Sequence, residues 1–560
     1  MVDTYQPKAN VKKGLSDEND VYLGVVSFSR RDTVFFAAAF VFIYSQLFQF
    51  PFTPYYFEGD HIIVISNAMR MLGGEVIYRD FFHLAPPGSE VMYATLFYLF
   101  GIKVWVLNLV ILFFSLAQVW LIWHFSRQFF TGLTVYLPSA IYLILGLRLF
   151  FIDGTYRLIS VVLILTAVAV VMKGRSARNL IIAGIICGLS AFFLHPRGAM
   201  GIAGISLFLV WENYRSGFNL KALVKTGLYL ALPFFLVIAI SQSYFIYQAG
   251  FENYYFSLVT FIQLHYPNDP LAQRSAFLQD FPRFWQFYEI YTPGSAISRY
   301  LRIIVPILFF YLLIPVVYFV FLVVRWTKKT YLSCSMIDAR LMLLCFVGLA
   351  LFAGVSVLSV IRLSHISIPG IILLVWLLKR TPYFQHLAAA CLILLTLIGA
   401  SYVIQRQTIA KSYLDMPAGE SAFLSDQIYD RYRWIGENTK PGDVFYEAHQ
   451  PSFYFPFHLV NPTPMYVIRD SGYTPIFQVE AVVKALQKNP PELILWPRKW
   501  TKPLESRVAG DNLEVLWRYV AANYQFEVEF GKPLDYTEHS EGDIEIWRRR
   551  KQASTFEELR

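Results

Sequence analysis

The sequence predicts an α-helical polytopic membrane protein that ends in a small soluble α/β domain. Of its 560 residues, 56% are hydrophobic and 18% aromatic, and only 16% are charged, compared with about 25% in a soluble protein. Several apolar runs reach the roughly 20 residues that a helix needs to cross a bilayer. After residue 404 the apolar runs give way to short, alternating helical and strand-like patterns. These observations separate a membrane part from a soluble tail.

Eleven apolar stretches are predicted to cross or enter the membrane. They are residues 33–50, 104–126, 133–151, 156–172, 179–195, 199–213, 224–247, 302–324, 340–360, 366–378 and 386–404. The fifth, sixth and tenth are short, so we expect them to be bent or half-buried. Lysine and arginine are enriched in the segments that lie on the same side of the membrane as the N-terminus. This enrichment indicates that the N-terminal side of the membrane is the cytoplasmic side.

An odd number of spans places the tail on the opposite side from the N-terminus. The predicted organisation is a cytoplasmic segment 1–32, a membrane domain 33–404 with an outer loop 51–103, and an extracytoplasmic domain 405–560. The host membrane is expected to be the plasma (inner) membrane. The formal charge of +9 follows from this inner enrichment, so nucleic acid is not an expected partner. The four cysteines form no CxxC or His–Cys cluster, which argues against a disulfide framework or structural zinc.

The tail has the alternation of a small α/β domain. Helices are predicted at 421–438, 476–489 and 512–525, and strands at 444–447, 465–468, 492–496, 526–530 and 544–547. We find no nucleotide-binding glycine loop in this region.

Acidic residues gather in the predicted outer loops, where they could do chemistry at the lipid surface. Asp60 and Asp80 lie in the first outer loop beside His61 and His83, and Asp153 lies in the next one. Carboxylates can accept a proton from a hydroxyl or hold a divalent metal. Each acid also has a plainer interpretation, because Asp60 could cap the helix that follows it and the other two could be turn residues, with Asp80 paired to its neighbouring arginine.

Basic side chains gather in the later outer loops. His195 and Arg197 lie between the fifth and sixth stretches, Arg362 and His365 lie just before the tenth, and His265 lies in the long loop between the seventh and eighth. Arginine can grip a phosphate with two parallel hydrogen bonds, and histidine can add a hydrogen bond or a proton. The plainer interpretations are an interfacial anchor for the first pair, snorkelling to the headgroups for the second, and an ordinary loop histidine at His265.

The first outer loop and the span pattern resemble the GT-C superfamily of polytopic glycosyltransferases. Within it, the chain is most similar to the dolichyl-phosphate-mannose protein mannosyltransferase type, including the bacterial branch with the aminoarabinose transferase. The residues that carry the resemblance are Gly59-Asp60, the helix 62–72, Gly73-Gly74, Tyr78-Arg79-Asp80-Phe81, Pro86-Pro87-Gly88 and 96–101. The tail resembles the extracytoplasmic domains that bacterial members often carry.

The resemblance implies a role for each candidate residue. Asp60 would be the catalytic acid residue of the first loop, and Asp80 and Asp153 would be further catalytic or supporting acids or metal ligands. The donor phosphate would be bound by the basic set, Arg197, Arg362, His365 and His195. His61 and His83 are further candidates, and the helix 91–99 would lie along the outer surface.

The chain departs from its relatives at three points. Many relatives have Asp-Glu where this chain has Asp60-His61, and a Lys or His where it has Ala85. It also lacks the Asp-x-Asp motif of oligosaccharyltransferases. A divalent metal such as Mg²⁺ or Mn²⁺ is therefore left open.

The expected function is transfer of a sugar, with inversion, from a polyprenyl-phosphate donor in the membrane lipid to an extracytoplasmic acceptor hydroxyl on protein, lipid or glycan. Three alternatives stay open. One is a polymerase or ligase of undecaprenyl-diphosphate-linked glycans. Another is a lipid or solute transporter, although internal repeats and mid-span acids, which transporters tend to show, are not seen. The last is a non-enzymatic relative whose tail binds glycan.

Overall fold

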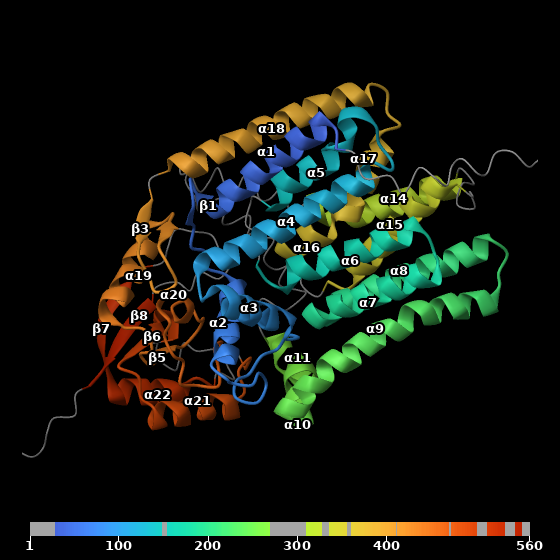
Figure 1. The fold of residues 1–560 in the computed structure, drawn as a ribbon. Helices are drawn as coiled ribbons and strands as arrows, with labels where there is room; N and C mark the ends of the chain where they lie inside the picture. The colour runs from blue at the N-terminus through green and yellow to red at the C-terminus, as the bar shows by residue number, and fades with distance from the viewer. Residues whose placement is uncertain are drawn as a thin grey trace, which may run out of the picture.

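The computed structural model describes residues 28–147, 154–268, 310–327, 335–355, 360–409, 411–469, 472–500, 512–531 and 544–550. Up to residue 409 the described chain is almost entirely helical, and the tail adds a small sheet (Figure 1). The helices of the first part are α1 (Arg30–Leu47), α2 (Asp60–Leu72), α3 (Gly88–Phe100), α4 (Val104–Ser126), η2 (Gly132–Val135), α5 (Leu137–Tyr142), η3 (Leu143–Leu147), α6 (Tyr156–Lys173), α7 (Ala177–Phe193), α8 (His195–Arg215), α9 (Leu220–Ala249), α10 (Phe251–Tyr255), η4 (Phe256–Thr260), α11 (Phe261–Leu264), η5 (Tyr266–Asn268), α14 (Ile314–Thr327), α15 (Met336–Ala353), α16 (Val360–Ile366), α17 (Ile368–Leu378) and α18 (Phe384–Thr408).

Six helices in the described chain are long and apolar enough to cross a membrane. They are Val104–Ser126, Tyr156–Lys173, Leu220–Ala249, Phe310–Thr327, Met336–Ala353 and Phe384–Thr408. Shorter apolar helices cover Leu137–Gly146, Ala177–Phe193 and Ile368–Leu378. The chain is therefore a membrane protein. Every predicted stretch overlaps a described helix, but length and composition establish six spans and not all eleven.

The packing of these helices relies on small residues at close crossings. At Gly184 of α7, a Cβ atom would lie 2.2 Å from the carbonyl oxygen of Leu230 in α9. At Gly204 of α8, it would lie 2.6 Å from the Cα of Val347 in α15. Glycine at such positions lets two helix backbones approach, which is a common device where lipid supplies no hydrophobic force between helices.

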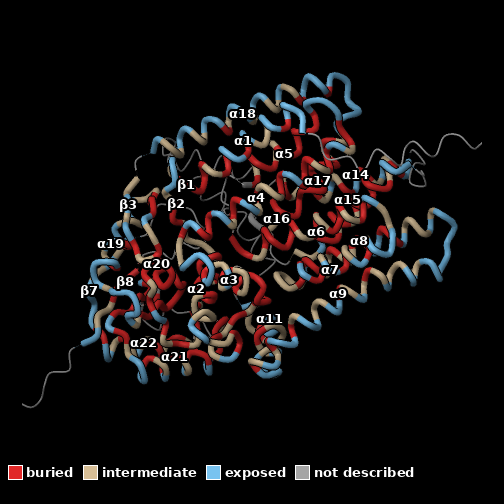
Figure 2. The backbone as a smooth tube through the Cα atoms, in the orientation of Figure 1, coloured by how far each residue is buried: buried red, intermediate tan, exposed pale blue. Residues whose placement is uncertain are grey.

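The outer faces of the bundle are apolar and exposed, as lipid contact requires. Figure 2 shows buried residues concentrated between the central helices, whereas α9 and α18 are mostly exposed or intermediate. Their most apolar windows have a mean hydropathy of 2.1 and 2.4, yet only 11% of each window is buried. Leu232 of α9, for instance, is 69% exposed.

The three cysteines in the described chain, Cys187, Cys345 and Cys391, are free.

The tail folds around one mixed sheet. Its elements are β3 (Ser412–Leu414), β4 (Ser421–Phe423), α19 (Asp426–Asn438), β5 (Phe445–Glu447), α20 (Tyr454–Phe457), α21 (Ile476–Lys488), β6 (Leu493–Pro497), η7 (Arg498–Trp500), α22 (Glu514–Asn523), β7 (Tyr524–Phe530) and β8 (Ile544–Arg549). The sheet order is β5-β6-β8-β7, in which β5 and β6 are parallel and the other pairs antiparallel. Buried side chains of α21, α22 and the sheet form a separate apolar core.

Most of the elements predicted for the tail are confirmed, and two predictions are wrong. The helix predicted from residue 421 begins at Asp426, because 421–423 pairs instead with Ser412–Leu414 as β4. The strand predicted at 465–468 is not a strand. The side chains of Asn461 and Thr463 donate to the carbonyl oxygen of Met465 at 2.9 and 2.8 Å, so this carbonyl has local donors in place of a neighbouring strand.

Two short strands and several backbone bonds attach the tail to the first outer loop. β1 (Phe48–Gln49) pairs with β2 (Thr53–Pro54), and Tyr55, just after β2, forms a bridge with Ala422 of β4. The backbone N–H of Val104, which begins α4, donates to the carbonyl oxygen of Ala418 at 3.0 Å. In Figure 1 the tail accordingly lies at the end of the bundle where α1 ends and α4 begins.

Candidate active site

The first outer loop forms α2 and α3, and Asp60 is the first residue of α2. The N-cap position belongs to Gly59, which offers no side-chain hydrogen bond. Asp60 is therefore not the cap of this helix. Its Oδ2 instead lies 2.5 Å from Nη2 of Arg157, 97 residues further along the chain at the start of α6. The Asp60 side chain is 28% exposed and that of Arg157 is 7% exposed.

Arg197, from the first turn of α8, contacts the backbone of Arg157. Its Nη1 donates to the backbone carbonyl oxygen of Arg157 and lies 3.5 Å from Oγ of Ser160. The Arg197 residue is buried, at 8% exposure. The structure thus gathers one carboxylate and two guanidinium groups from α2, α6 and α8 at a single end of the helix bundle.

Helix α3 holds the start of α6 in place. The hydroxyl of Tyr93 in α3 donates to the carbonyl oxygen of Gly154 at 2.7 Å. Thr155 then caps α6, since its Oγ1 accepts the backbone N–H of Arg157 at 3.3 Å. At the other end of α3, a Cβ on Gly88 would lie 2.6 Å from the carbonyl oxygen of Phe192, so this glycine permits close contact with α7. The Pro-Pro-Gly break therefore seats α3 between α7 and the second outer loop.

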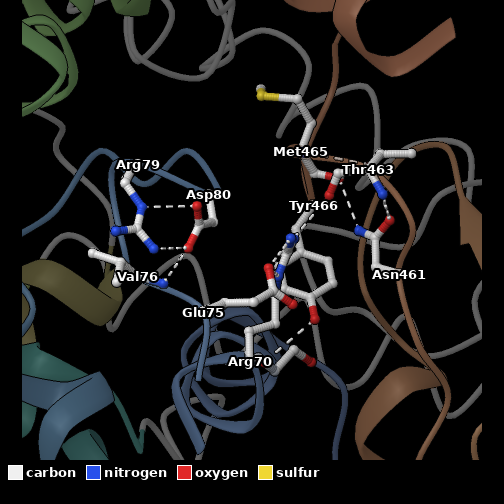
Figure 3. Close-up of polar contacts among 10 residues, drawn as sticks. Arg70, Glu75, Val76, Arg79, Asp80, Asn461, Thr463, Met465 and Tyr466 are labelled. Carbon is white, nitrogen blue, oxygen red and sulfur yellow. Dashed lines mark hydrogen bonds and ion pairs between the residues drawn. The ribbon is translucent and has the colours of Figure 1, made fainter. Parts of the chain in front are cut away.

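Asp80 lies in a local arrangement of its own. Its carboxylate accepts from Nε and Nη2 of Arg79 at 2.9 and 2.8 Å and from the backbone N–H of Val76 at 2.7 Å (Figure 3). The Arg79 hydrogen bond holds the pKa of the Asp80 carboxyl below its ordinary value. The turn interpretation is therefore confirmed, and no contact in the described chain joins Asp80 to Asp60. A catalytic role for Asp80 stays a prediction.

The segment beside Asp80 is anchored to the tail. Arg70 at the end of α2 pairs with Glu75, and its Nη1 donates to the carbonyl oxygen of Thr463 at 2.9 Å. Its guanidinium also lies over the ring of Tyr466, 5.2 Å from the centroid. Figure 3 shows this group reaching from the loop to the tail segment. These contacts fix the position of the loop against the tail, and they pair the Arg70 guanidinium with the Glu75 carboxylate.

His83 belongs to a buried polar group between α2 and α3. Its Nε2 lies 2.8 Å from Oε1 of Glu90, which is fully buried, and its Nδ1 lies 3.1 Å from Nδ2 of Asn67. The ring therefore contacts Asn67 of α2 through one nitrogen and Glu90 of α3 through the other. His83 therefore links the two helices of the first loop to each other.

The other predicted histidines are tied to nearby groups. Nε2 of His61 lies 2.9 Å from the carbonyl oxygen of Phe57, one helical turn earlier. Nε2 of His195 lies 3.3 Å from Nε2 of Gln242 in α9. His265 packs its ring against Phe261, with centroids 5.5 Å apart, which agrees with an ordinary loop histidine.

The predicted pair Arg362 and His365 lies in α16. Nη2 of Arg362 is 3.4 Å from the hydroxyl of Tyr266 in η5. His365 is only 1% exposed, with its Nδ1 3.2 Å from the hydroxyl of Tyr142 in the bundle interior. Snorkelling to the headgroups is therefore wrong for His365. Asp153 lies outside the described residues.

Two residues of this region were not predicted as site residues. Arg157 is not among the candidates taken from the sequence, although it follows the candidate acid Asp153 by four positions. Glu58, two residues before Asp60, accepts from Nη2 of Arg431 at 3.0 Å and from the hydroxyl of Tyr432 at 2.9 Å. Both donors belong to α19 of the tail. Burial raises the pKa of Tyr432 well above its ordinary value, so this hydroxyl stays a donor.

The described side chains do not form a metal site by themselves. No group of three or more His, Cys, Asp or Glu side chains that could hold an ion occurs in the parts of the chain that the structure describes. Asp153, the predicted supporting acid, is outside those parts. A divalent metal therefore stays an open question for this site.

Comparison with solved structures identifies the architecture. The apo structure of ArnT from Cupriavidus metallidurans matches with a TM-score of 0.51 and 13% identity, covering 92% of this chain and 97% of that one. This chain has the GT-C fold. A second ArnT structure from the same organism, bound to undecaprenyl phosphate, matches with a TM-score of 0.46 and 12% identity over 92% of this chain and 97% of that one.

An oligosaccharyltransferase structure also matches. The apo oligosaccharyltransferase of Archaeoglobus fulgidus matches with a TM-score of 0.45 and 11% identity, over 83% of this chain and 69% of that one. No family model matches the sequence, and no curated protein matches it. The resemblance to the GT-C superfamily inferred from the first loop is thus confirmed at the level of the fold.

Proposed function

We propose that this chain is an inverting membrane glycosyltransferase that takes a sugar from a polyprenyl-phosphate donor and attaches it to an acceptor hydroxyl outside the cytoplasm. The observation that carries the proposal is the meeting of Asp60 with Arg157 at the tail end of the bundle. Transfer from a lipid phosphate needs a carboxylate beside a guanidinium. The carboxylate accepts the proton of the acceptor hydroxyl, and the guanidinium binds the leaving phosphate. The GT-C fold supports the same reaction class.

In the proposed reaction the acceptor oxygen forms a bond to the anomeric carbon of the sugar. The bond from that carbon to the phosphate oxygen breaks on the opposite face, and its electron pair leaves with the polyprenyl phosphate. The acceptor proton passes to the Asp60 carboxylate and later to solvent. The transition state has oxocarbenium-ion character, as in other glycosyl transfers.

The exposure of the two partners fits these roles. Asp60 is the more exposed member of the pair, at 28%, which suits a group that an acceptor must reach. Arg157 is 7% exposed, which suits a group that holds a lipid-linked phosphate away from solvent. A well-placed donor in a site of this kind stabilises the transition state by about 2.7–4 kcal/mol. Arg362 is the further phosphate ligand that we retain from the sequence.

The sidedness and the lipid are part of the proposal. We place the site and the tail on the outer face of the plasma (inner) membrane, because the predicted inner ends of the helices carry more lysine and arginine. Undecaprenyl phosphate is our first choice of lipid, since an ArnT structure contains that molecule. Mannose, aminoarabinose and arabinose are the sugars to try first.

The proposal is tested by incubating the purified full chain in lipid nanodiscs with radiolabelled polyprenyl-phosphate sugars and cell-envelope acceptors. We expect transfer with the native chain and its loss with Asp60→Asn. The matched control is Asp338→Asn, which alters another buried ion pair. In that pair, Nη1 of Arg325 in α14 lies 2.7 Å from Oδ1 of Asp338 in α15. Transfer from diphosphate-linked glycans only would favour the polymerase or ligase alternative, and a fully active Asp60→Asn chain would refute the proposed chemistry.

A further inference from the structure

We propose that the Asp60–Arg157 pair is an exchangeable ion pair: the donor phosphate takes Arg157 as its partner and so releases Asp60 to receive the acceptor proton. The inference rests on the proposed function, in which Arg157 handles the leaving phosphate, and goes beyond it by adding that donor binding breaks the ion pair with Asp60.

The two residues of the pair differ in how their backbone is held and in how exposed their side chains are. The backbone of Arg157 is held from behind by Arg197, which donates to its carbonyl oxygen, and from α6 by the Thr155 cap. Its guanidinium packs near the ring of Tyr156, 5.4 Å from the centroid. The side chain of Asp60 is 28% exposed, compared with 7% for Arg157. In the proposed exchange the more exposed carboxylate therefore moves, while the backbone contacts keep Arg157 in place.

The chemistry of the two anions favours the exchange. A guanidinium offers a planar fork that matches phosphate oxygens in two parallel hydrogen bonds. A phosphate bound to that fork would lie close to the Asp60 carboxylate, and two neighbouring anions repel each other in a poorly hydrated site. The repulsion is relieved when Asp60 turns away or accepts a proton. Binding of the donor phosphate therefore makes Asp60 a better proton acceptor.

The charge on the phosphate grows during the reaction. The sugar-linked donor is a phosphodiester with one negative charge, whereas the departing polyprenyl phosphate is a monoester whose charge at neutral pH is about −1.5 to −2. The attraction to Arg157 therefore strengthens as the carbon–oxygen bond breaks. An interaction that is stronger in the transition state than in the bound substrate accelerates the reaction. Arg197 acts in this scheme as a positioning residue that keeps Arg157 in place.

The experiment measures binding and transfer separately on the full chain in nanodiscs. The binding probe is undecaprenyl phosphate without a sugar, and the variants are Asp60→Asn, Arg157→Gln and Arg157→Lys, with Asp338→Asn as the matched control. Because Asp60→Asn removes the competing anion, we expect it to bind the probe about tenfold more tightly while transfer is lost. Arg157→Gln should bind about tenfold more weakly, and Arg157→Lys should fall between, because it keeps the charge without the fork.

The outcomes separate the inference from the proposed function. Equal or weaker binding of the probe by Asp60→Asn would overturn the exchange even if the native chain transfers sugar. Tighter binding by Asp60→Asn in a chain that transfers none of the sugars would keep the exchange and overturn the proposed function. If Arg157→Gln fails to fold, Arg157→Lys decides the point, and native affinity with native transfer in that variant would also overturn the exchange.

Discussion

Replacing Arg431 by methionine should loosen the attachment of the tail to the loop that carries Asp60. In the native chain, Nη2 of Arg431 lies 3.0 and 3.1 Å from the two carboxylate oxygens of Glu58. The side chains are 6% and 18% exposed, so the pair is poorly screened by solvent. Methionine fills a similar volume but leaves the Glu58 carboxylate with the Tyr432 hydroxyl as its donor from α19.

The expected loss follows from these contacts. Removing one partner of a fully buried pair costs about 3–5 kcal/mol, and an exposed pair contributes about 0–1 kcal/mol. Because Glu58 is partly exposed and keeps the Tyr432 hydrogen bond, we expect the free energy of unfolding to fall by about 2 kcal/mol, within the range for charge-assisted hydrogen bonds. Arg433, also on α19, is the control: it is 50% exposed, and Arg433→Met should cost less than about 0.5 kcal/mol.

The assay is a double-mutant cycle on unfolding in mixed detergent micelles, followed by tryptophan fluorescence. Glu58→Gln removes the stranded charge, so the double variant with Arg431→Met should recover part of the loss, with a coupling energy of about 1–2 kcal/mol. The transfer rate should fall in Arg431→Met more than in the Arg433 control, because Glu58 is two residues from Asp60. Additive effects of the two substitutions, within about 0.5 kcal/mol, would refute the reasoning.

Three further predictions concern single positions. Asp80→Asn should lower the free energy of unfolding by about 0.5 kcal/mol at pH 7. Because the Arg79 bond depresses the native pKa of Asp80 below the ordinary 3.8, this difference should disappear as the pH falls through that native pKa, and a constant difference down to pH 2 in thermal melts would contradict it. Gly184→Ala should cost about 1–3 kcal/mol in micelle unfolding because its methyl group meets a backbone carbonyl of α9, whereas Gly227→Ala, with open space around it, should cost nothing. Tyr93→Phe should cost about 1 kcal/mol and lower the transfer rate, and unchanged values of both would show that this hydroxyl does not support the second outer loop.

Local patterns in the sequence predicted the elements well. Apolar stretches of membrane length, and alternation in the tail, depend only on neighbouring residues, so α4, α6 and α18 and the strands β5 to β8 could be expected. The failure at 465–468 has a local cause as well: Asn461 and Thr463 satisfy the carbonyl of Met465, and an alternating pattern does not reveal such a bond.

The site was only partly predictable because its contacts join distant parts of the chain. Asp60 could be picked from the first loop, but its partner Arg157 is 97 positions away, and Glu58 meets Arg431 across 373 positions. One sequence gives no signal for such pairs. The turn that holds Asp80 is different, since its partner is the adjacent residue, and that interpretation could be made without a structure.

The bridge between Tyr55 and Ala422 has a consequence for how the protein is made. A ribosome synthesises the first loop early, but the backbone groups that brace it emerge only after all the membrane helices have been translated. Chains arrested before that point would insert into the bilayer with Asp60 on an unbraced segment. Insertion of the helices and bracing of this loop are thereby separated in time, because the bracing waits until residue 422 has been made.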